Sequence, residues 1–248
     1  MNNNYWSRLR NFWFPSWWVL GWILLGLPAL YFLQTFVHEG SHAVAAWFST
    51  GNFPKFFPFP HVDAAAGFRN GVTFTGGNGF IATPQFVDVG LILAFMAIFI
   101  FWPLRNRMAR FALRFLFLGV CIDLLYNTLK GLWGGSGRFS DWGKFQVDVG
   151  TAGIIVITWL IWLLVLSHFL WVYYSAWQRE QEAPAGFWDF RWIALAFGLL
   201  SLMALMFAAF VSDPALDKSH PVFIVAVVGQ VLALVGYGLY FGLSFRQH

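Results

Sequence analysis

Two histidines and a glutamate form the group of side chains whose types and spacing are best suited to chemistry. His38, Glu39 and His42 lie close together within residues 36–46. Because the histidines are four residues apart, a helix places both imidazoles on one face, where they can bind one metal ion. Glu39 can border that ion without binding it, and so can act as general base towards a metal-bound water. The spacing therefore predicts a Zn²⁺ site with His38 and His42 as ligands and Glu39 as the catalytic residue.

The surroundings of this motif make a purely structural role costly. The motif belongs to an apolar run over residues 17–48. Histidines and a carboxylate in an apolar segment cost several kcal/mol unless they are paired or bound to a metal. This cost favours a metal site over a cluster of polar side chains that only supports the fold.

A catalytic zinc ion usually takes a third protein ligand. The residues that could supply it are Asp141, Asp123, Asp148, Asp88, His61 and His168. Asp141 is favoured because it stands between a glycine-rich loop and the predicted fourth helix, where Ser140 could act as N-cap. That position is near a membrane surface, as is the position expected for His42.

The other candidates have simpler explanations or less suitable positions. Asp123 lies in the middle of an apolar run, where a buried pair with Lys130 or Asn127 explains it as well as metal binding does. Asp148 lies two turns deeper than Asp141. Helix packing is the better explanation for His168, a lone histidine in an apolar run. The third ligand therefore stays open between Asp141, Asp123 and Asp148.

The composition of the chain is that of a membrane protein. Of its 248 residues, 59% are hydrophobic and 10% are charged, whereas soluble domains carry about 25% charged residues. The apolar runs are near the length of a membrane-spanning helix and do not alternate as barrel strands do. The net charge of +4 comes from basic residues beside these runs, which favours membrane orientation over binding of nucleic acid. The single cysteine, Cys121, excludes an intrachain disulfide.

The pattern of apolar runs predicts an all-α integral membrane protein with about six transmembrane helices in a single domain, residues 1–248. The predicted helices cover residues 17–48, 87–104, 111–133, 149–177, 192–211 and 221–244. Residues 50–86 are rich in glycine and proline, which is typical of turns and hairpins. We expect this segment to form either a loop outside the membrane or a re-entrant β-hairpin covered by protein or water.

Basic residues mark alternate connections between the predicted helices. They are Arg8, Arg10, Arg105, Arg107, Arg110, Arg114, Arg179, Arg191 and Arg246. The positive-inside rule therefore places both termini in the cytoplasm and residues 134–146 and 212–220 outside. We expect a multi-pass protein of the cell (inner) membrane, with the lipid bilayer as its first partner.

The motif and its flanks resemble the site-2 protease family of intramembrane zinc metallopeptidases, in particular its minimal branch. The resemblance is carried by residues 36–46, the Ser49-Thr50-Gly51 stretch and the glycine-rich residues 52–80. Ala82-Thr83-Pro84-Gln85 and Ser140-Asp141-Trp142 are similar to later family segments, although the usual Leu-Asp-Gly around the late aspartate is absent. The resemblance covers roughly residues 30–150. It implies that His38, His42 and Asp141 bind zinc and that Glu39 activates water.

Two functional hypotheses follow from these observations. The first is a zinc-dependent metalloendopeptidase that hydrolyses peptide bonds of a membrane-anchored protein substrate. The second is a non-catalytic membrane protein, such as an assembly factor, a carrier or a complex subunit, which keeps the motif for structure. A histidine-box di-iron enzyme is set aside because six scattered histidines supply too few ligands. The sequence specifies neither the substrate nor the oligomeric state.

Overall fold

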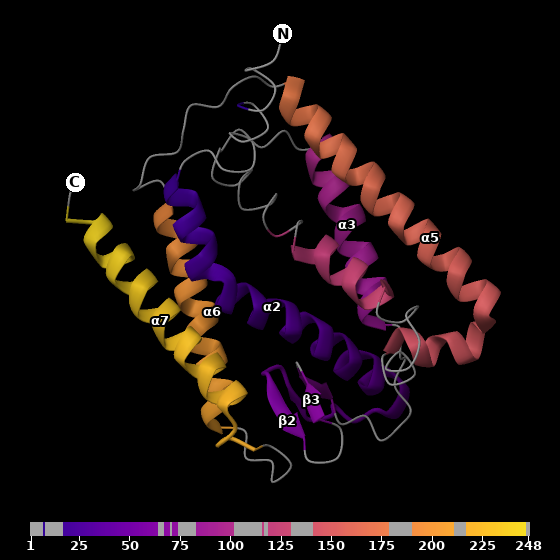
Figure 1. Ribbon diagram of the computed structural model, residues 1–248, viewed down its shortest axis with the longest axis horizontal. Coiled ribbons are helices and arrows are strands. Elements are labelled where there is room, and N and C mark those ends of the chain that lie inside the picture. The colour runs from indigo at the N-terminus through magenta and orange to yellow at the C-terminus, as the bar shows by residue number, and fades with distance from the viewer. Residues whose placement is uncertain are drawn as a thin grey trace. The chain divides into compact units, whose positions relative to one another are not determined.

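The computed structural model of the chain is mostly helical (Figure 1). It describes residues 7, 17–63, 67–69, 71–73, 83–101, 116, 119–129, 141–178, 190–210 and 217–246. The labelled helices are α2 (Trp17–Thr50), α3 (Thr83–Phe101), α5 (Asp141–Gln178), α6 (Arg191–Phe210) and α7 (Pro221–Ser244). The strands, all between α2 and α3, are β1 (Phe56–Phe57), β2 (His61–Asp63), β3 (Gly67–Arg69) and β4 (Val72–Thr73).

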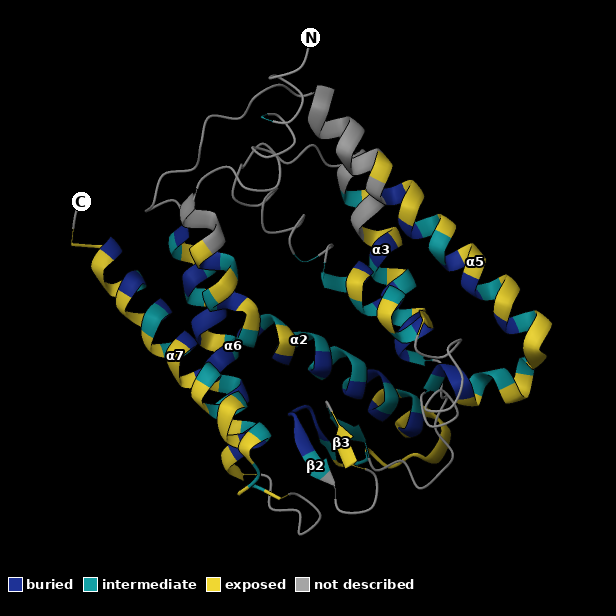
Figure 2. Cartoon of the chain, viewed as in Figure 1, coloured by how far each residue is buried: buried dark blue, intermediate teal, exposed yellow. Residues whose placement is uncertain are grey.

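The predicted helical fold is confirmed, and four of the described helices are long and apolar enough to cross a membrane. These candidate spans are Gly21–Thr50, Asp141–His168, Arg191–Phe210 and Pro221–Ser244. Shorter apolar helices, Thr83–Ala94 and Gly119–Leu129, lie where the second and third spans are predicted. Figure 2 shows exposed residues along α6, α7 and the coloured part of α5, and many of them are large and apolar, as lipid-facing side chains are. Six spans and cytoplasmic termini stay predictions, since most of the basic residues lie outside the described ones.

The described chain divides into two compact units. The first contains Met1–Gly40, Pro54–Phe74 and Gln181–His248, and thus the first part of α2, the strands, α6 and α7. In it Trp22 packs against Tyr240, with ring centroids 4.2 Å apart, and Tyr237 donates a hydrogen bond to the Trp22 carbonyl. Gly26 allows close packing, because a Cβ atom there would lie 2.7 Å from a ring carbon of Phe197. The Gln230 amide donates to the Pro28 carbonyl at 2.8 Å.

The four strands form a nested antiparallel hairpin within the first unit. β1 pairs with β4 so that Phe56 lies opposite Thr73, and β2 pairs with β3 so that His61 lies opposite Arg69. Residues 58–60 separate the two ladders, because Pro58 and Pro60 have no N–H to donate. The hairpin therefore consists of an outer ladder, β1–β4, and an inner ladder, β2–β3, which are not joined by continuous strand pairing. It lies within the segment 50–86, where the sequence predicts a loop or a hairpin.

The second unit contains Ser41–Phe53 and Thr75–Glu180, and thus the end of α2, α3 and α5. The structure differs from the sequence prediction at α5, which begins at Asp141 rather than near residue 149. Gly150, with a φ of 74°, interrupts the helical conformation, so residues 141–149 form a separate segment ahead of the apolar one. The Trp142 indole donates to the Thr158 hydroxyl at 3.1 Å and joins the two segments.

Candidate metal centre

His38 and His42 lie on consecutive turns near the end of α2. The helix runs without interruption from Trp17 to Thr50, so the four-residue spacing predicted to align the imidazoles is realised. At the end of the helix the Thr50 hydroxyl donates to the Ala46 carbonyl at 2.8 Å. Two histidines on a regular helix are fixed relative to each other by the backbone, which prepares one side of a metal site.

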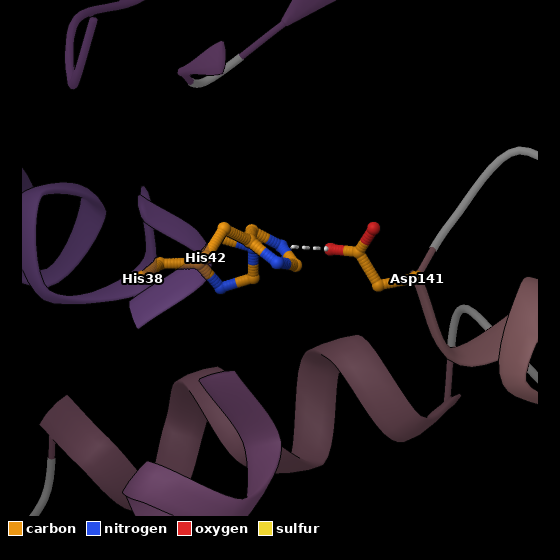
Figure 3. A group of neighbouring side chains, drawn as sticks. All are labelled: His38, His42 and Asp141. Atoms are coloured by element: carbon orange, nitrogen blue, oxygen red, sulfur yellow. Dashed lines mark hydrogen bonds and ion pairs between the residues drawn. The ribbon is translucent and has the colours of Figure 1, made fainter. Parts of the chain in front are cut away.

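Asp141, the first residue of α5, lies against His42. A carboxylate oxygen of Asp141 is 3.1 Å from His42 Nε2, and its other oxygen is 4.0 Å from Lys144 Nζ. Figure 3 shows both imidazoles on adjacent turns of α2 beside this carboxylate. His38, His42 and Asp141 each offer a ligand atom within 4.8 Å of the other two. Within the described part of the chain, these three residues are the group of histidine, cysteine and acidic side chains that could hold a metal ion.

The chemistry of this donor set fits zinc. Two imidazoles and one carboxylate are common ligands of a catalytic zinc ion, and they leave the fourth position free. Ligands that each bind at about 2.0–2.2 Å in a tetrahedron are separated by roughly 3.3–3.6 Å, which is close to the 3.1 Å between His42 and Asp141. The side chains of His42 and Asp141 are 11% and 24% exposed, so the group is shielded yet open to solvent. A small rearrangement would let all three bind one ion.

Glu39 is not part of this group, and the hairpin holds its side chain. Glu39 is buried. Thr73 Oγ1 lies 2.6 Å from Oε2 of the Glu39 carboxylate and 2.9 Å from the backbone carbonyl oxygen of Glu39. Gly71 lies so close that a Cβ atom there would be 2.7 Å from Cγ of Glu39. A carboxylate that is buried beside metal ligands and fixed by a hydroxyl can exchange a proton at a defined position.

The other predicted candidates for the third ligand lie elsewhere. Asp123 accepts a hydrogen bond from Asn127 at 2.9 Å, which is one of the two pairs that the sequence suggests. Asp148 is exposed, seven residues beyond Asp141 on the same segment. Lys130, the other possible partner of Asp123, lies outside the described residues, and so does Ser140, the possible N-cap of the fourth helix.

The three remaining candidates are buried and apart from the group. Asp88 lies on α3, and His168 lies on the apolar part of α5. His61 is on β2, where its Nδ1 is 2.9 Å from the Phe59 carbonyl and its ring packs against Phe57. The structure thus brings together His38, His42 and Asp141 from the predicted set and none of the alternatives.

Sequence reasoning missed Thr73 and Gly71. Both stand in the glycine-rich segment, and nothing in their local sequence distinguishes them from neighbouring turn residues. Only the pairing of β1 with β4 brings the Gly71–Thr73 stretch against Glu39, and that register is not readable from one sequence.

Comparisons of the chain with protein-family models, with curated proteins and with solved structures find no match. The functional interpretation therefore depends on the geometry and chemistry of the site itself.

Proposed function

We propose that the protein is an intramembrane zinc metallopeptidase that hydrolyses peptide bonds of membrane-anchored protein substrates. The observation that carries the proposal is the group of His38, His42 and Asp141, with the buried carboxylate of Glu39 on the same helix. The four described helices that are long and apolar enough to span a membrane support an intramembrane reaction. The resemblance of residues 30–150 to the site-2 protease family points to the same reaction.

In the proposed mechanism His38, His42 and Asp141 hold the ion, and Glu39 transfers protons. When bound, zinc acts as a Lewis acid that polarises the scissile carbonyl and makes water a better nucleophile at neutral pH. Glu39 accepts a proton as water attacks the carbonyl carbon, and then returns that proton to the leaving amine. One water is consumed, the peptide C–N bond breaks, and a carboxylate and an amine are released. Thr73 keeps the Glu39 carboxylate in place during both transfers.

The alternative is a non-catalytic membrane protein in which the same residues support the fold. The direct contact of His42 with Asp141 favours this alternative, because such a pair needs no metal. It does not explain why a ligand atom of His38 lies within the same group, nor why a buried carboxylate is held next to it. A structural role and a catalytic role differ in one measurable respect, which is the formation of new peptide termini.

A comparison of peptide termini in membranes tests the proposal. Membranes containing wild type should accumulate new N-termini from membrane-anchored proteins, whereas membranes containing Glu39→Gln should not. The chelator 1,10-phenanthroline should abolish the wild-type products, because hydrolysis needs the metal. The proposal is wrong if wild type and Glu39→Gln yield the same termini at equal expression.

The hydrogen bond from Thr73 to Glu39 gives a second expectation. Thr73→Val removes the hydroxyl but keeps the shape, and we expect kcat to fall by about 10-fold to 100-fold, as for loss of a hydrogen bond to a charged group. KM and zinc content should change little, because Thr73 is outside the ligand group. Thr73→Ser restores the hydroxyl and should restore kcat. An unchanged kcat in Thr73→Val would show that the bond does not position Glu39.

A further inference from the structure

The first half of α2 packs against α6 and α7 within the first compact unit (Figure 1). A Cβ atom at Gly26 would lie 2.7 Å from a ring carbon of Phe197 on α6 and 3.0 Å from the Tyr237 hydroxyl on α7. Further along α2, the rings of Phe32 and Phe207 have centroids 6.0 Å apart. These contacts show that α2 and α6 run in the same direction here, and they fix which residues of the two helices lie at one level.

Gln230 of α7 is bonded to α2 between these contacts. Its side chain is 3% exposed, and its Nε2 donates to the Pro28 carbonyl at 2.8 Å. A carbonyl only accepts hydrogen bonds, so this contact specifies that the NH₂ group of the carboxamide meets α2 and leaves the oxygen Oε1 for another partner. Pro28 has no N–H, so the Leu24 carbonyl one turn earlier lacks the donor that an ordinary helix supplies.

A buried serine of α6 lies at the level of this proline. Ser201 is 0% exposed and is one turn beyond Phe197. Pro28 is about half a turn beyond Gly26, the residue that Phe197 contacts. Since the two helices run in the same direction, Ser201 lies within about one turn of the level at which Gln230 binds α2.

Two polar atoms at this level need a partner. In the described part of the chain, neither Ser201 Oγ nor Gln230 Oε1 has a hydrogen-bond partner. A buried polar atom without a partner is costly, and nearly all such atoms in folded proteins are bonded to protein or to an ordered water. The serine can donate a hydrogen bond, whereas the glutamine oxygen can only accept one. A molecule that both accepts and donates would satisfy the two together.

The neighbouring side chains are too small and apolar to serve as this partner. Ala29, Ala204 and Ala233 are each 0% exposed, and they lie within one turn of the proline, the serine and the glutamine on their respective helices. A methyl group forms no hydrogen bond and takes little space. The junction of α2, α6 and α7 therefore combines polar atoms that need a partner with neighbours that suit a small one.

We propose that the α2–α6–α7 junction binds one water molecule between Ser201 and Gln230. The water accepts a hydrogen bond from the Ser201 hydroxyl and donates one to Gln230 Oε1, and its second hydrogen is available to the Leu24 carbonyl. About three hydrogen bonds are typical of a buried water. An ion is poorly matched, because none of these groups is charged. The site does not depend on the proposed peptidase function, and it links the metal-binding helix to both of its neighbours at its proline.

The sign of one stability change tests the proposal. Ser201→Ala should destabilise the full-length protein in detergent micelles, because the water loses its donor. We expect the equilibrium constant of unfolding in SDS to rise by about 3-fold to 20-fold, the range for hydrogen bonds between membrane helices. If the hydroxyl had no partner, its removal would stabilise the protein instead. A neutral or stabilising Ser201→Ala therefore overturns the proposal.

A double-mutant cycle separates a bridging water from a hydrogen bond within α6. Gln230→Met keeps a long side chain and removes the carboxamide. In this background the effect of Ser201→Ala should shrink by at least about 2-fold, because the two side chains share one partner. Ser244→Ala is the matched control, since Ser244 is buried on α7 and donates to the Phe241 carbonyl at 2.7 Å, far from Gln230. Its effect should add to that of Gln230→Met. A destabilising Ser201→Ala that is equally additive overturns the proposal, because the hydroxyl would then be bonded within its own helix.

X-ray diffraction from crystals of the wild-type protein, at a resolution that shows ordered waters, locates the water directly. One density peak should lie about 2.5–3.0 Å from both Ser201 Oγ and Gln230 Oε1. Well-ordered side chains without such a peak, or a direct hydrogen bond between the two, would overturn the proposal.

Discussion

Glu39→Gln should retain its zinc and lose hydrolysis by at least about 100-fold, as expected for removal of a general base. The carboxylate of Glu39 is held by Thr73 and is not among the three grouped ligand atoms, so the ion does not depend on it. His38→Ala and His42→Ala should instead abolish bound zinc and hydrolysis together, because either change leaves two ligands. Metal analysis of the purified variants and the appearance of new peptide termini measure the two effects separately.

His220→Ala is a suitable control for the histidine variants. His220 caps α7 by accepting from the Val222 N–H, and it lies outside the grouped ligands, so its loss should lower stability and leave zinc content unchanged. If folded Glu39→Gln is purified without zinc, Glu39 is a ligand and its assignment as general base is wrong. If zinc persists in both His38→Ala and His42→Ala, the ion is bound elsewhere.

Asp141→Ala should weaken zinc binding far more than Asp123→Ala does. Asp141 is 3.1 Å from His42 Nε2, whereas Asp123 accepts a hydrogen bond from Asn127 on its own helix. Loss of a direct ligand should exceed the roughly 10-fold to 100-fold loss of affinity that follows removal of an outer-shell partner. Asp123→Ala should lower the yield of folded protein, because Asn127 then loses its partner in an apolar helix.

Zinc retained after a mild challenge with EDTA decides between the two aspartates. The expected order is wild type, then Asp123→Ala, with Asp141→Ala almost empty. Asp148→Ala is the matched control, because Asp148 is exposed on the same segment of α5 and is outside the group. A well-folded Asp123→Ala that is empty while Asp141→Ala stays metallated would move the third ligand to the helix Gly119–Leu129.

The helices could be predicted from sequence because each depends on a local run of apolar residues. α6 matches its predicted range within one residue at each end, and α7 matches its predicted range at both ends. The apolar pattern alone placed the fourth span at residues 149–177, because Asp141, Lys144 and Asp148 interrupt it, whereas the N-cap position of Ser140 correctly indicated a helix start at Asp141. The hairpin was expected only as one of two alternatives, since the register of the β1–β4 and β2–β3 ladders is not specified by the local sequence.

The site shows the same difference between local and non-local information. The spacing of His38 and His42 specifies their common face as soon as the segment is helical. Asp141 is 99 residues from His42, so the sequence could favour it by its position at a helix start but could not exclude Asp123 or Asp148. Thr73 had no signal at all, because its contact with Glu39 arises from the fold of the hairpin.

X-ray absorption at the zinc edge of the purified wild-type protein tests the central claim most directly. The account predicts one zinc ion per chain, coordinated only by nitrogen and oxygen at about 2.0–2.2 Å, with the scattering pattern of two imidazoles. That pattern should fall to one imidazole or disappear in His42→Ala. A protein purified without zinc and unable to bind it at equimolar concentration would contradict the account, and so would a zinc–sulfur distance of about 2.3 Å, which would place the ion at Cys121.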